Sequence, residues 1–369
     1  MLGAIWDYSP YIIKYSAFMV GALGFFGLLA LWMFQCDLVY PSSFPATSRE
    51  RVPLPSQYGM PDFDDVHLDT HDNVKIRGYL IKRPTEDETR KAPTILYLQA
   101  NAGNIGHRLP IAKMLYDSLN CNIFMLSYRG YGLSEGQPRE AGIRLDALTA
   151  LEFIRSHHLT ANTKLIAYGQ SLGGAVAIDI IANEPNEFAG AILENTFLSI
   201  PKLIPSVMPW LKYVSFLSSE KWCSEDQIKK ITNVPILFLS GQQDDLVPSE
   251  HMKMLYDLSS AYNEKPVSIE LFPNGKHNDT CVQPEYFDKV KQWWEINVIP
   301  APKYKPTGRV GGELREISRK SVDGDDDTEK TEESNIQEKP IGANVSEKSK
   351  RETMVEDITE VETDLDDSE

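Results

Sequence analysis

The sequence has few cysteines and no excess of basic residues. Its 369 residues include four cysteines, Cys36, Cys121, Cys223 and Cys281, and no Cys-x-x-Cys pair. Zinc sites need clustered Cys and His ligands, so this spacing implies no metal site, and no sequence motif implies a cofactor. The formal net charge of −16 argues against a nucleic-acid partner, because such proteins neutralise phosphates with basic surface.

Large apolar side chains are scarce at the C-terminus. From Lys303 onward the chain has 11 Lys and Arg against 20 Asp and Glu, and Tyr304 is its only aromatic residue. Such a segment cannot bury enough apolar surface to offset its chain entropy. We therefore expect a disordered acidic tail over residues 298–369, which either binds a protein partner or only solvates the chain.

Charged residues are absent from residues 15–34. Twenty uncharged residues are enough to cross a hydrocarbon core of about 30 Å as a helix, and aromatic residues such as Trp6 and Trp32 flank or end the run. A cleaved signal peptide is one alternative, but its apolar region usually has about 7–15 residues; a buried core helix is another. We expect a membrane anchor over residues 1–40, with a transmembrane helix at about 15–34, and a linker over residues 41–61.

Residues 62–297 alternate apolar strand-like runs with amphipathic helix-like runs. This alternation predicts an α/β domain whose mostly parallel sheet has helices on both faces. Runs 65–70 and 74–82 are separated by three polar residues and predict an antiparallel hairpin. The other predicted strands are 93–99, 122–128, 164–168, 190–194, 234–240 and 267–272, and the predicted helices are 105–118, 139–157, 249–258, 284–296 and one directly after Ser171.

A serine lies between two glycines where one predicted strand gives way to a helix, in Gly169-Gln170-Ser171-Leu172-Gly173. In a nucleophile elbow the serine occupies a sharp, strained turn, so small residues are needed two positions to either side. An ordinary helix N-cap is the alternative for this serine. The buried strand before it and the apolar helix after it favour the elbow, and we predict that Ser171 is a nucleophile.

A serine nucleophile needs a base and a group that orients the base. In this architecture the acid and the histidine follow the serine in that order. Asp244 lies in the loop after the seventh strand and is preferred to Asp245, although either could simply cap the next helix. His277 follows the last strand, a place that none of the other six histidines occupies. We predict Asp244 as orienter and His277 as base, with a surface-loop histidine as the alternative.

Acyl transfer also needs hydrogen-bond donors for the developing oxyanion. The backbone N–H of Leu172 is one predicted donor, because it follows the nucleophile at the positive end of a helix. The loop after the third predicted strand, residues 99–104, should supply the other, with Asn101 as the preferred residue.

An apolar, proline-containing insertion over residues 197–233 separates two predicted strands. Its prolines interrupt helices and its apolar residues face more than one side, which indicates a small cap over the site. Packing on the sheet is the simpler alternative. We expect the cap to line an acyl pocket near the bilayer.

Five stretches of the sequence carry a resemblance to a known family. They are residues 101–108 (NAGNIGHR), 127–136 (SYRGYGLSEG), 169–175 (GQSLGGA), 194–200 (ENTFLSI) and 277–280 (HNDT). Together they resemble the membrane-anchored α/β-hydrolase-domain proteins of the bud-emergence (BEM) type, over about residues 15–297. The resemblance implies a serine esterase with one N-terminal span, usually of type II topology, and a triad of Ser171, Asp244 and His277. Its membrane would be the endoplasmic reticulum or the plasma membrane.

One pair of residues departs from the pattern of many α/β hydrolases, which have His-Gly where this chain has Gln99-Ala100. Glycine adopts backbone conformations that alanine resists, so the second oxyanion donor could be displaced here. We expect hydrolysis of a lipid ester or of an S-acyl thioester on a protein, through an acyl-serine intermediate. The alternative is a weakly active or inactive membrane-tethered scaffold in cell polarity or membrane organisation, and transfer of the acyl group to an acceptor other than water would use the same residues.

Overall fold

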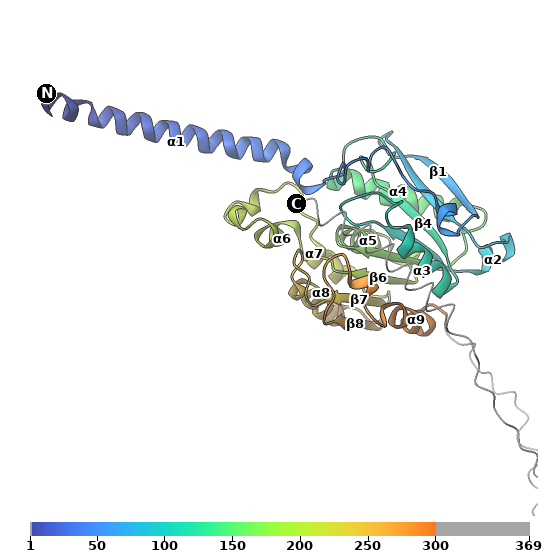
Figure 1. The fold of residues 1–369 in the computed structure, drawn as a ribbon. Coiled ribbons are helices and arrows are strands. Elements are labelled where there is room, and N and C mark those ends of the chain that lie inside the picture. Colours follow the sequence, from blue (N-terminus) through green and yellow to red (C-terminus); the bar gives the residue numbers. More distant parts are fainter. Residues whose placement is uncertain (1, 300–369) are drawn as a thin grey trace, which may run out of the picture.

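The computed structural model describes residues 2–299, and an eight-stranded sheet lies at the centre of the domain (Figure 1). The strand order is β1-β2-β4-β3-β5-β6-β7-β8. β1 pairs with β2 and β2 with β4 in antiparallel fashion, and all other neighbours are parallel. The strands are β1 (Phe63–Asp69), β2 (Lys75–Ile81), β3 (Thr94–Leu98), β4 (Asn122–Ser127), β5 (Leu165–Gln170), β6 (Gly190–Glu194), β7 (Ile236–Gly241) and β8 (Val267–Phe272).

This sheet confirms the predicted fold class, down to the opening hairpin and the place of the serine after a central strand. The predicted acidic tail lies outside the described residues except for its first two, Val298 and Ile299.

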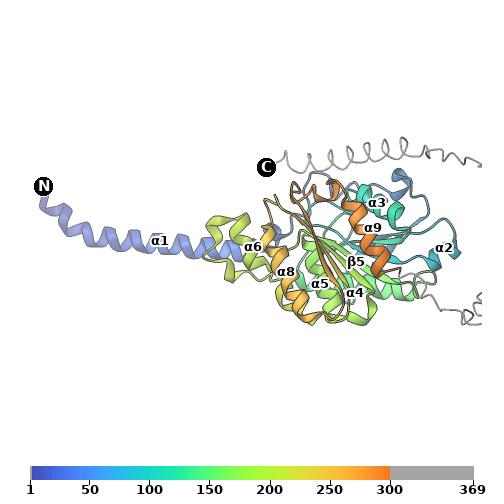
Figure 2. The same ribbon diagram turned by 90° about the horizontal axis from the view of Figure 1, so that it is seen from below.

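Helices cover the two faces of the sheet, as Figure 2 shows. One face carries α4 (Glu140–Ser156), α5 (Leu172–Asn183) and α8 (Ser249–Tyr262), and the other carries α3 (Leu109–Leu119) and α9 (Tyr286–Asn297). Because successive strand residues point to opposite faces, Leu96 and Leu98 of β3 join the core under α5, whereas Ile95 and Tyr97 join the core under α3 and α9. Because both faces of the inner strands are covered by helices, a strand such as β3 has no polar face.

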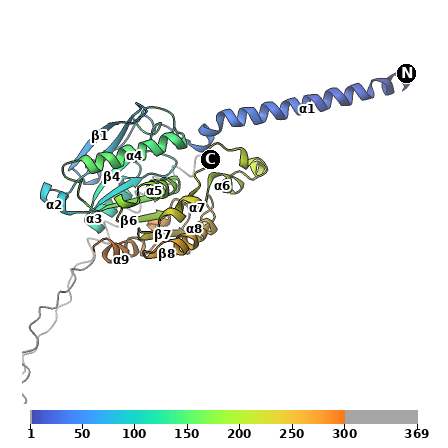
Figure 3. The same ribbon diagram turned by 180° about the vertical axis from the view of Figure 1, so that it is seen from behind.

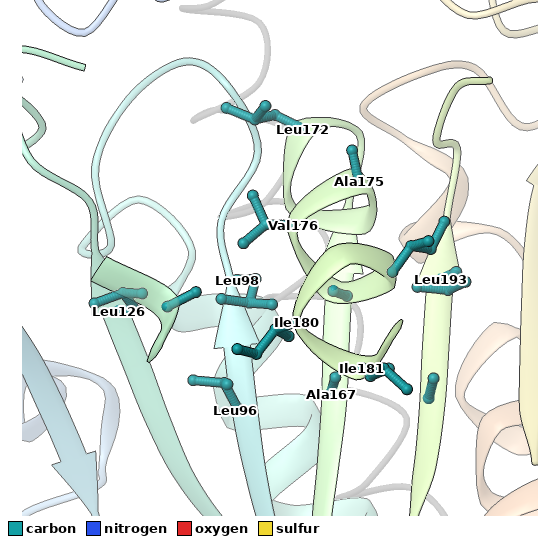
Figure 4. Close-up of a cluster of buried hydrophobic side chains, with 14 of the residues drawn as sticks. Leu96, Leu98, Leu126, Ala167, Leu172, Ala175, Val176, Ile180, Ile181 and Leu193 are labelled. Carbon is teal, nitrogen blue, oxygen red and sulfur yellow. The ribbon is translucent and has the colours of Figure 1, made fainter. Parts of the chain in front are cut away.

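Helix α5, which follows the serine, packs against the middle of the sheet (Figure 4). Its residues Val176 and Ile180 lie over Leu96 and Leu98 of β3, and all four side chains are buried. Burying one such side chain contributes about 1.5–3 kcal/mol, so this contact holds α5 firmly against the central strands.

Two predicted helices differ from the structure by four residues at one end, and one helix was missed; α8 ends at Tyr262 rather than at residue 258. Helix α3 begins at Leu109 rather than at residue 105, because residues 105–108 form turns that bring the chain out of the preceding loop. The short helix α2 (Glu86–Lys91) was not predicted. Its capping box, in which Thr85 and Glu88 each accept a backbone N–H of the other, is a sequence signal that would have found it.

The N-terminal helix α1 (Leu2–Val39) projects from the domain (Figure 1, Figure 3). Its segment Lys14–Val39 has a mean hydropathy of 2.1 and is not buried in the domain. By length and composition this segment is able to cross a bilayer, and its lack of burial rules out the core-helix alternative.

The insertion after β6 forms the cap, which we define as residues 197–233. It contains α6 (Ile200–Val207), α7 (Ser224–Gln227) and the short 3-10 helices η3 (Pro209–Leu211), η4 (Ser215–Leu217) and η5 (Ile228–Lys230). The base of α1 is fastened to it: the Ser219 backbone N–H donates to Gln35 Oε1 at 2.7 Å, and the Tyr40 hydroxyl donates to Glu220 Oε2 at 2.5 Å. Helix α1 and the cap are thus held together at one end of the molecule.

Candidate active site

Ser171 has the strained backbone expected of a nucleophile elbow. It lies between β5 and α5 with φ 54° and ψ −117°, a region that non-glycine residues seldom occupy. A Cβ added at Gly169 would collide with the Gly173 carbonyl, and one at Gly173 would collide with the Leu98 carbonyl of β3. Both glycines are therefore required by the close approach of helix, turn and strand.

The serine hydroxyl does not cap the helix that it precedes. Ser171 stands at the N-cap position of α5 but makes no side-chain capping bond, and its backbone lies outside the extended region that N-cap residues favour. The alternative that Ser171 serves as an ordinary N-cap is therefore wrong, because its hydroxyl makes no capping hydrogen bond. The hydroxyl remains available at the cavity.

Asp244 and His277 come together from the loops after β7 and β8. Asp244 Oδ2 lies 2.8 Å from His277 Nδ1, and both side chains are buried. Asp244 Oδ1 accepts the backbone N–H groups of Leu246 and Val247 at 3.0 and 2.7 Å. The neighbouring Asp245 is exposed, so of the two carboxylates considered, the preferred one contacts the histidine.

His277 and Ser171 line the same cavity. No hydrogen bond joins the Ser171 hydroxyl to the His277 ring among the residues that the structure describes. Catalytic hydrogen bonds are often long without substrate and shorten in the Michaelis complex, so the shared cavity is the relevant geometric fact.

Asn195 fixes the histidine loop and was missed by sequence reasoning as a site residue. Its Nδ2 donates to the carbonyls of Lys276 and His277, each at 3.1 Å, and its Oδ1 accepts the Gly241 N–H at 2.8 Å. Its φ of 43° is in the left-handed region, which asparagine tolerates better than most residues. One side chain therefore ties the ends of β6 and β7 to the loop that carries His277.

A buried carboxyl lies behind the elbow. Glu194, at the end of β6, is fully buried and accepts hydrogen bonds from the hydroxyls of Tyr168, at 2.6 Å, and Tyr286. Burial raises the pKa of Glu194 above its usual value, and the two hydroxyl donors oppose that rise. The Glu194 carbonyl accepts the Ser171 N–H at 2.9 Å, so this residue supports the turn.

The predicted oxyanion donors face the cavity. Leu172 and Asn101 both line it. The side chain of Asn101 is already used: its Nδ2 donates to the Val39 carbonyl at 2.6 Å, and its Oδ1 accepts the Tyr131 hydroxyl at 2.8 Å. Within residues 2–299 the backbone N–H groups of Leu172 and Asn101 have no acceptor, and neither have those of Ala100 and Ala102.

Ala100 does not have the backbone conformation that would disfavour alanine. Gly103, with φ 76°, has a positive φ in this loop, and Ala100 does not. The positive φ of this loop lies three residues later, at a glycine, and displacement of the second oxyanion donor by Gln99-Ala100 stays a prediction.

The cavity has a volume of about 620 Å³ and is built from three parts of the chain. The loops at the sheet edge supply Ser171, His277 and residues 100–102. Helix α1 and the cap supply the other two walls. Their lining residues are mostly apolar: Phe25, Leu28, Leu29, Leu31, Trp32, Gln35, Leu38, Val39, Phe197, Ile200, Leu203, Ile204, Val207, Met208, Leu211, Val214, Ser215, Leu217 and Ser218.

The sequence contains two Asn-x-Ser/Thr glycosylation sequons, Asn278-Asp279-Thr280 and Asn344-Val345-Ser346, and the first lies at this cavity. Asn278 lines it beside His277, and the Thr280 hydroxyl of the same sequon is buried and donates to the Lys276 carbonyl at 2.6 Å. A glycan on Asn278 would therefore stand at the site. The second sequon, at Asn344, lies outside the described residues, and across residues 2–299 no group of three or more His, Cys, Asp or Glu side chains is placed to hold a metal ion.

Comparisons with known proteins agree with this architecture. A family model described as serine aminopeptidase, S33, matches residues 111–224, which include Ser171 but neither Asp244 nor His277. The chain is 20% identical to an esterase of Pyrococcus furiosus, Pf2001, with a TM-score of 0.56 over 66% of this chain and 94% of that one; this likeness shows the fold.

Two curated relatives are closer in sequence. An uncharacterized membrane protein of Saccharomyces cerevisiae is 39% identical over 273 residues, which are 74% of this chain and 93% of that protein. Protein bem46 of Schizosaccharomyces pombe is 43% identical over 292 residues, which are 79% of this chain and 96% of the relative. At that identity over nearly the full length of the relative, this chain belongs to the Bem46-like α/β hydrolases.

Proposed function

We propose that the protein is a membrane-bound serine hydrolase that cleaves a carboxylic ester or S-acyl thioester of a lipid or an acylated protein. The observation that carries this proposal is the elbow serine Ser171 facing the same cavity as the His277–Asp244 pair. The apolar lining from the cap and α1 supports a long acyl chain as the group that enters.

The first half-reaction acylates the serine. The Ser171 hydroxyl oxygen attacks the acyl carbon while His277 Nε2 takes its proton, and the Asp244 carboxylate holds the opposite ring nitrogen and stabilises the imidazolium. The tetrahedral oxyanion forms next to the Leu172 backbone N–H and one N–H of the 100–102 loop. When it collapses, the bond to the alcohol or thiol breaks, and His277 returns the proton to the leaving group.

The second half-reaction releases the acid. A water molecule attacks the acyl-serine while His277 removes its proton, and that proton goes to the Ser171 oxygen as the carboxylic acid leaves. The net change is one water consumed and one ester or thioester bond broken.

We propose further that α1 anchors the protein in a membrane, the endoplasmic reticulum or plasma membrane being the expected compartments. The 26-residue segment Lys14–Val39 is predominantly apolar and exceeds the length that a bilayer core requires. The cavity wall formed by α1 supports entry of the acyl chain from the bilayer side.

Labelling of the full-length protein in isolated membranes with a fluorophosphonate probe tests the proposal, because the probe reacts with activated serines irrespective of substrate. We expect labelling that Ser171→Ala abolishes. Ser259→Ala is the matched control, since Ser259 of α8 is buried with a hydroxyl that has no partner within the described chain. Folded protein that does not label, or that labels despite Ser171→Ala, would favour the scaffold or another nucleophile.

A further inference from the structure

One positively charged side chain of the active-site cavity has no partner. Arg108, at the N-cap position of α3, lines the cavity together with Ser171 and His277 and is only 2% exposed. Its guanidinium makes no hydrogen bond and no ion pair with any residue from 2 to 299, and its Nε is completely enclosed. A buried cation with unused donors therefore faces the reacting groups.

Such an arginine is costly to the folded protein. The guanidinium is positively charged and has five N–H donors in a planar fork. A buried charge normally has an opposite charge and hydrogen bonds to offset its lost hydration. Arg129, the other strongly buried arginine, follows this rule: it pairs with Asp72 and Asp146 at 2.6 and 2.8 Å. Arg108 departs from it.

Glu194 does not supply the missing partner. The positive charge of Arg108 acts on Glu194 through space, but the two side chains form no ion pair within the described chain, and the Glu194 carboxyl already accepts from Tyr168 and Tyr286. The attraction between the two charges acts at a distance, and it does not give the N–H donors of Arg108 a hydrogen-bond acceptor.

The chemistry of the cavity indicates what would satisfy them. No Asp or Glu is among the residues that line it in the described chain, and Arg108 is the one lining side chain with a permanent charge. The remaining walls are mostly apolar. An occupant that matches both features has a long apolar chain and an anionic oxygen group.

We propose that Arg108 binds a phosphate or carboxylate group of the substrate, in the same cavity in which Ser171 attacks the acyl carbon. The substrate class is then an amphipathic ester with an anionic head group, which the guanidinium fork binds through charge-assisted hydrogen bonds. This inference rests on the proposed function, because it concerns the ester that Ser171 cleaves.

Three esters with one common acyl chain test the proposal on the full-length protein in uncharged detergent. They are 1-oleoylglycerol, its 3-phosphate and its 3-hemisuccinate, so that the head group is neutral, a phosphate or a carboxylate. We expect kcat/KM for one anionic ester to exceed that of the neutral ester by about tenfold or more, as a charge-assisted hydrogen bond supplies. Equal values for all three, or preference for the neutral ester, overturn the proposal.

Variants assign the preference to this residue. Arg108→Gln should bring the anionic-to-neutral ratio near one, and Arg108→Lys should leave an intermediate ratio, since lysine keeps the charge but not the fork. Arg90→Gln, at a half-exposed arginine of α2, is the matched control and should keep the wild-type ratio. A purely structural role predicts the opposite pattern: a lower melting temperature for Arg108→Gln with an unchanged ratio.

A binding measurement separates this proposal from the proposed function. The Ser171→Ala protein should bind oleoylglycerol 3-phosphate or the hemisuccinate about tenfold more tightly than oleoylglycerol. Tighter anion binding without any wild-type turnover upholds the role of Arg108 and contradicts the hydrolase. Turnover of the neutral ester without any preference for the anionic esters upholds the hydrolase and contradicts the role of Arg108.

Discussion

The two carboxylate oxygens of Asp244 have different partners, so one oxygen holds the loop and the other is available to the histidine. Oδ1 accepts two backbone N–H groups of its own loop, whereas Oδ2 meets His277 Nδ1 at 2.8 Å. With the side chain 1% exposed, water does not compete for that contact. The carboxylate is therefore fixed as an acceptor that selects the ring tautomer with hydrogen on Nδ1.

Replacing this acceptor should damage turnover far more than binding. We expect Asp244→Asn to lower kcat by about 10²–10⁴-fold with little change in KM, because an amide can hold the histidine in the wrong tautomer. The measurement is steady-state hydrolysis of p-nitrophenyl esters. Asp245→Asn at the exposed neighbouring position is the control and should behave as wild type; equal losses in both variants would assign the effect to the loop as a whole.

His107 makes the loop over residues 99–104 sensitive to acid. Its Nδ1 accepts the Asn104 N–H at 3.2 Å, which requires an unprotonated nitrogen. Burial and then the nearby charge of Arg108 lower the pKa of His107 to about 4, whereas an unfolded histidine has a pKa of about 6.5. The unfolded chain therefore takes up its proton first, and the contribution to the free energy of unfolding is complete above pH 6.5 and lost as the pH falls toward 4.

His107→Asn should remove this pH dependence, since the amide oxygen can replace Nδ1 as acceptor without titrating. We expect the free energy of unfolding of the wild type, relative to the variant, to fall by about 1–2 kcal/mol between pH 7 and pH 4. Urea unfolding at several pH values measures it. A constant difference across that range would show that His107 does not titrate in this way.

Residues near the site differ in how far the sequence reveals them. Ser171, Asp244 and His277 each follow a strand, so chain order and strand pattern were enough to propose them. Asn195 and Arg108 have no comparable local signal. Asn195 acts on residues 46 and 85 positions away, and Arg108 is notable for partners that it lacks, which only a folded structure shows.

At the scale of elements, the strands were predictable and the cavity walls were not. A strand buried on both faces is apolar throughout, so its sequence alone marks it. The cap was predicted as an apolar insertion, but its fit against α1 depends on polar contacts such as Ser219 to Gln35, 184 residues apart. The cavity therefore forms between two elements whose sequences each read as apolar in isolation.

Filling the cap wall should shorten the acyl chain that the proposed hydrolase accepts. Ile204 of α6 lines the cavity, and Ile204→Trp adds bulk where the chain of a long ester would lie. We expect kcat/KM for long-chain p-nitrophenyl esters to fall about tenfold or more, because overpacking costs about 1–3 kcal/mol. The value for p-nitrophenyl acetate should change little. Tyr213→Trp, at an exposed cap position that does not line the cavity, is the control; a uniform loss across chain lengths would contradict the acyl-pocket assignment.

At the scale of the whole molecule, the cap lies on the side of the domain from which α1 projects (Figure 1), and it carries exposed aromatic side chains. Trp210, Tyr213 and Phe216 are 71%, 78% and 68% exposed. Aromatic rings are favoured at membrane–water interfaces, and exposed apolar patches mark interaction surfaces. If α1 crosses the bilayer, the cap it is fastened to must lie near that bilayer, and these side chains are placed to enter its interface.

Loss of this contact should reduce the use of membrane-bound substrate only. We expect the triple variant Trp210→Ser, Tyr213→Ser, Phe216→Ser to lower kcat/KM about tenfold for a long-chain ester held in vesicles, yet to hydrolyse soluble p-nitrophenyl acetate as wild type does, since the catalytic residues are untouched. The matched control replaces three exposed apolar residues outside the cap, Tyr262, Leu271 and Ile296, by serine and should change neither rate. Equal losses on both substrates would indicate that the cap acts by packing, because a membrane contact has no effect on an ester that is free in water.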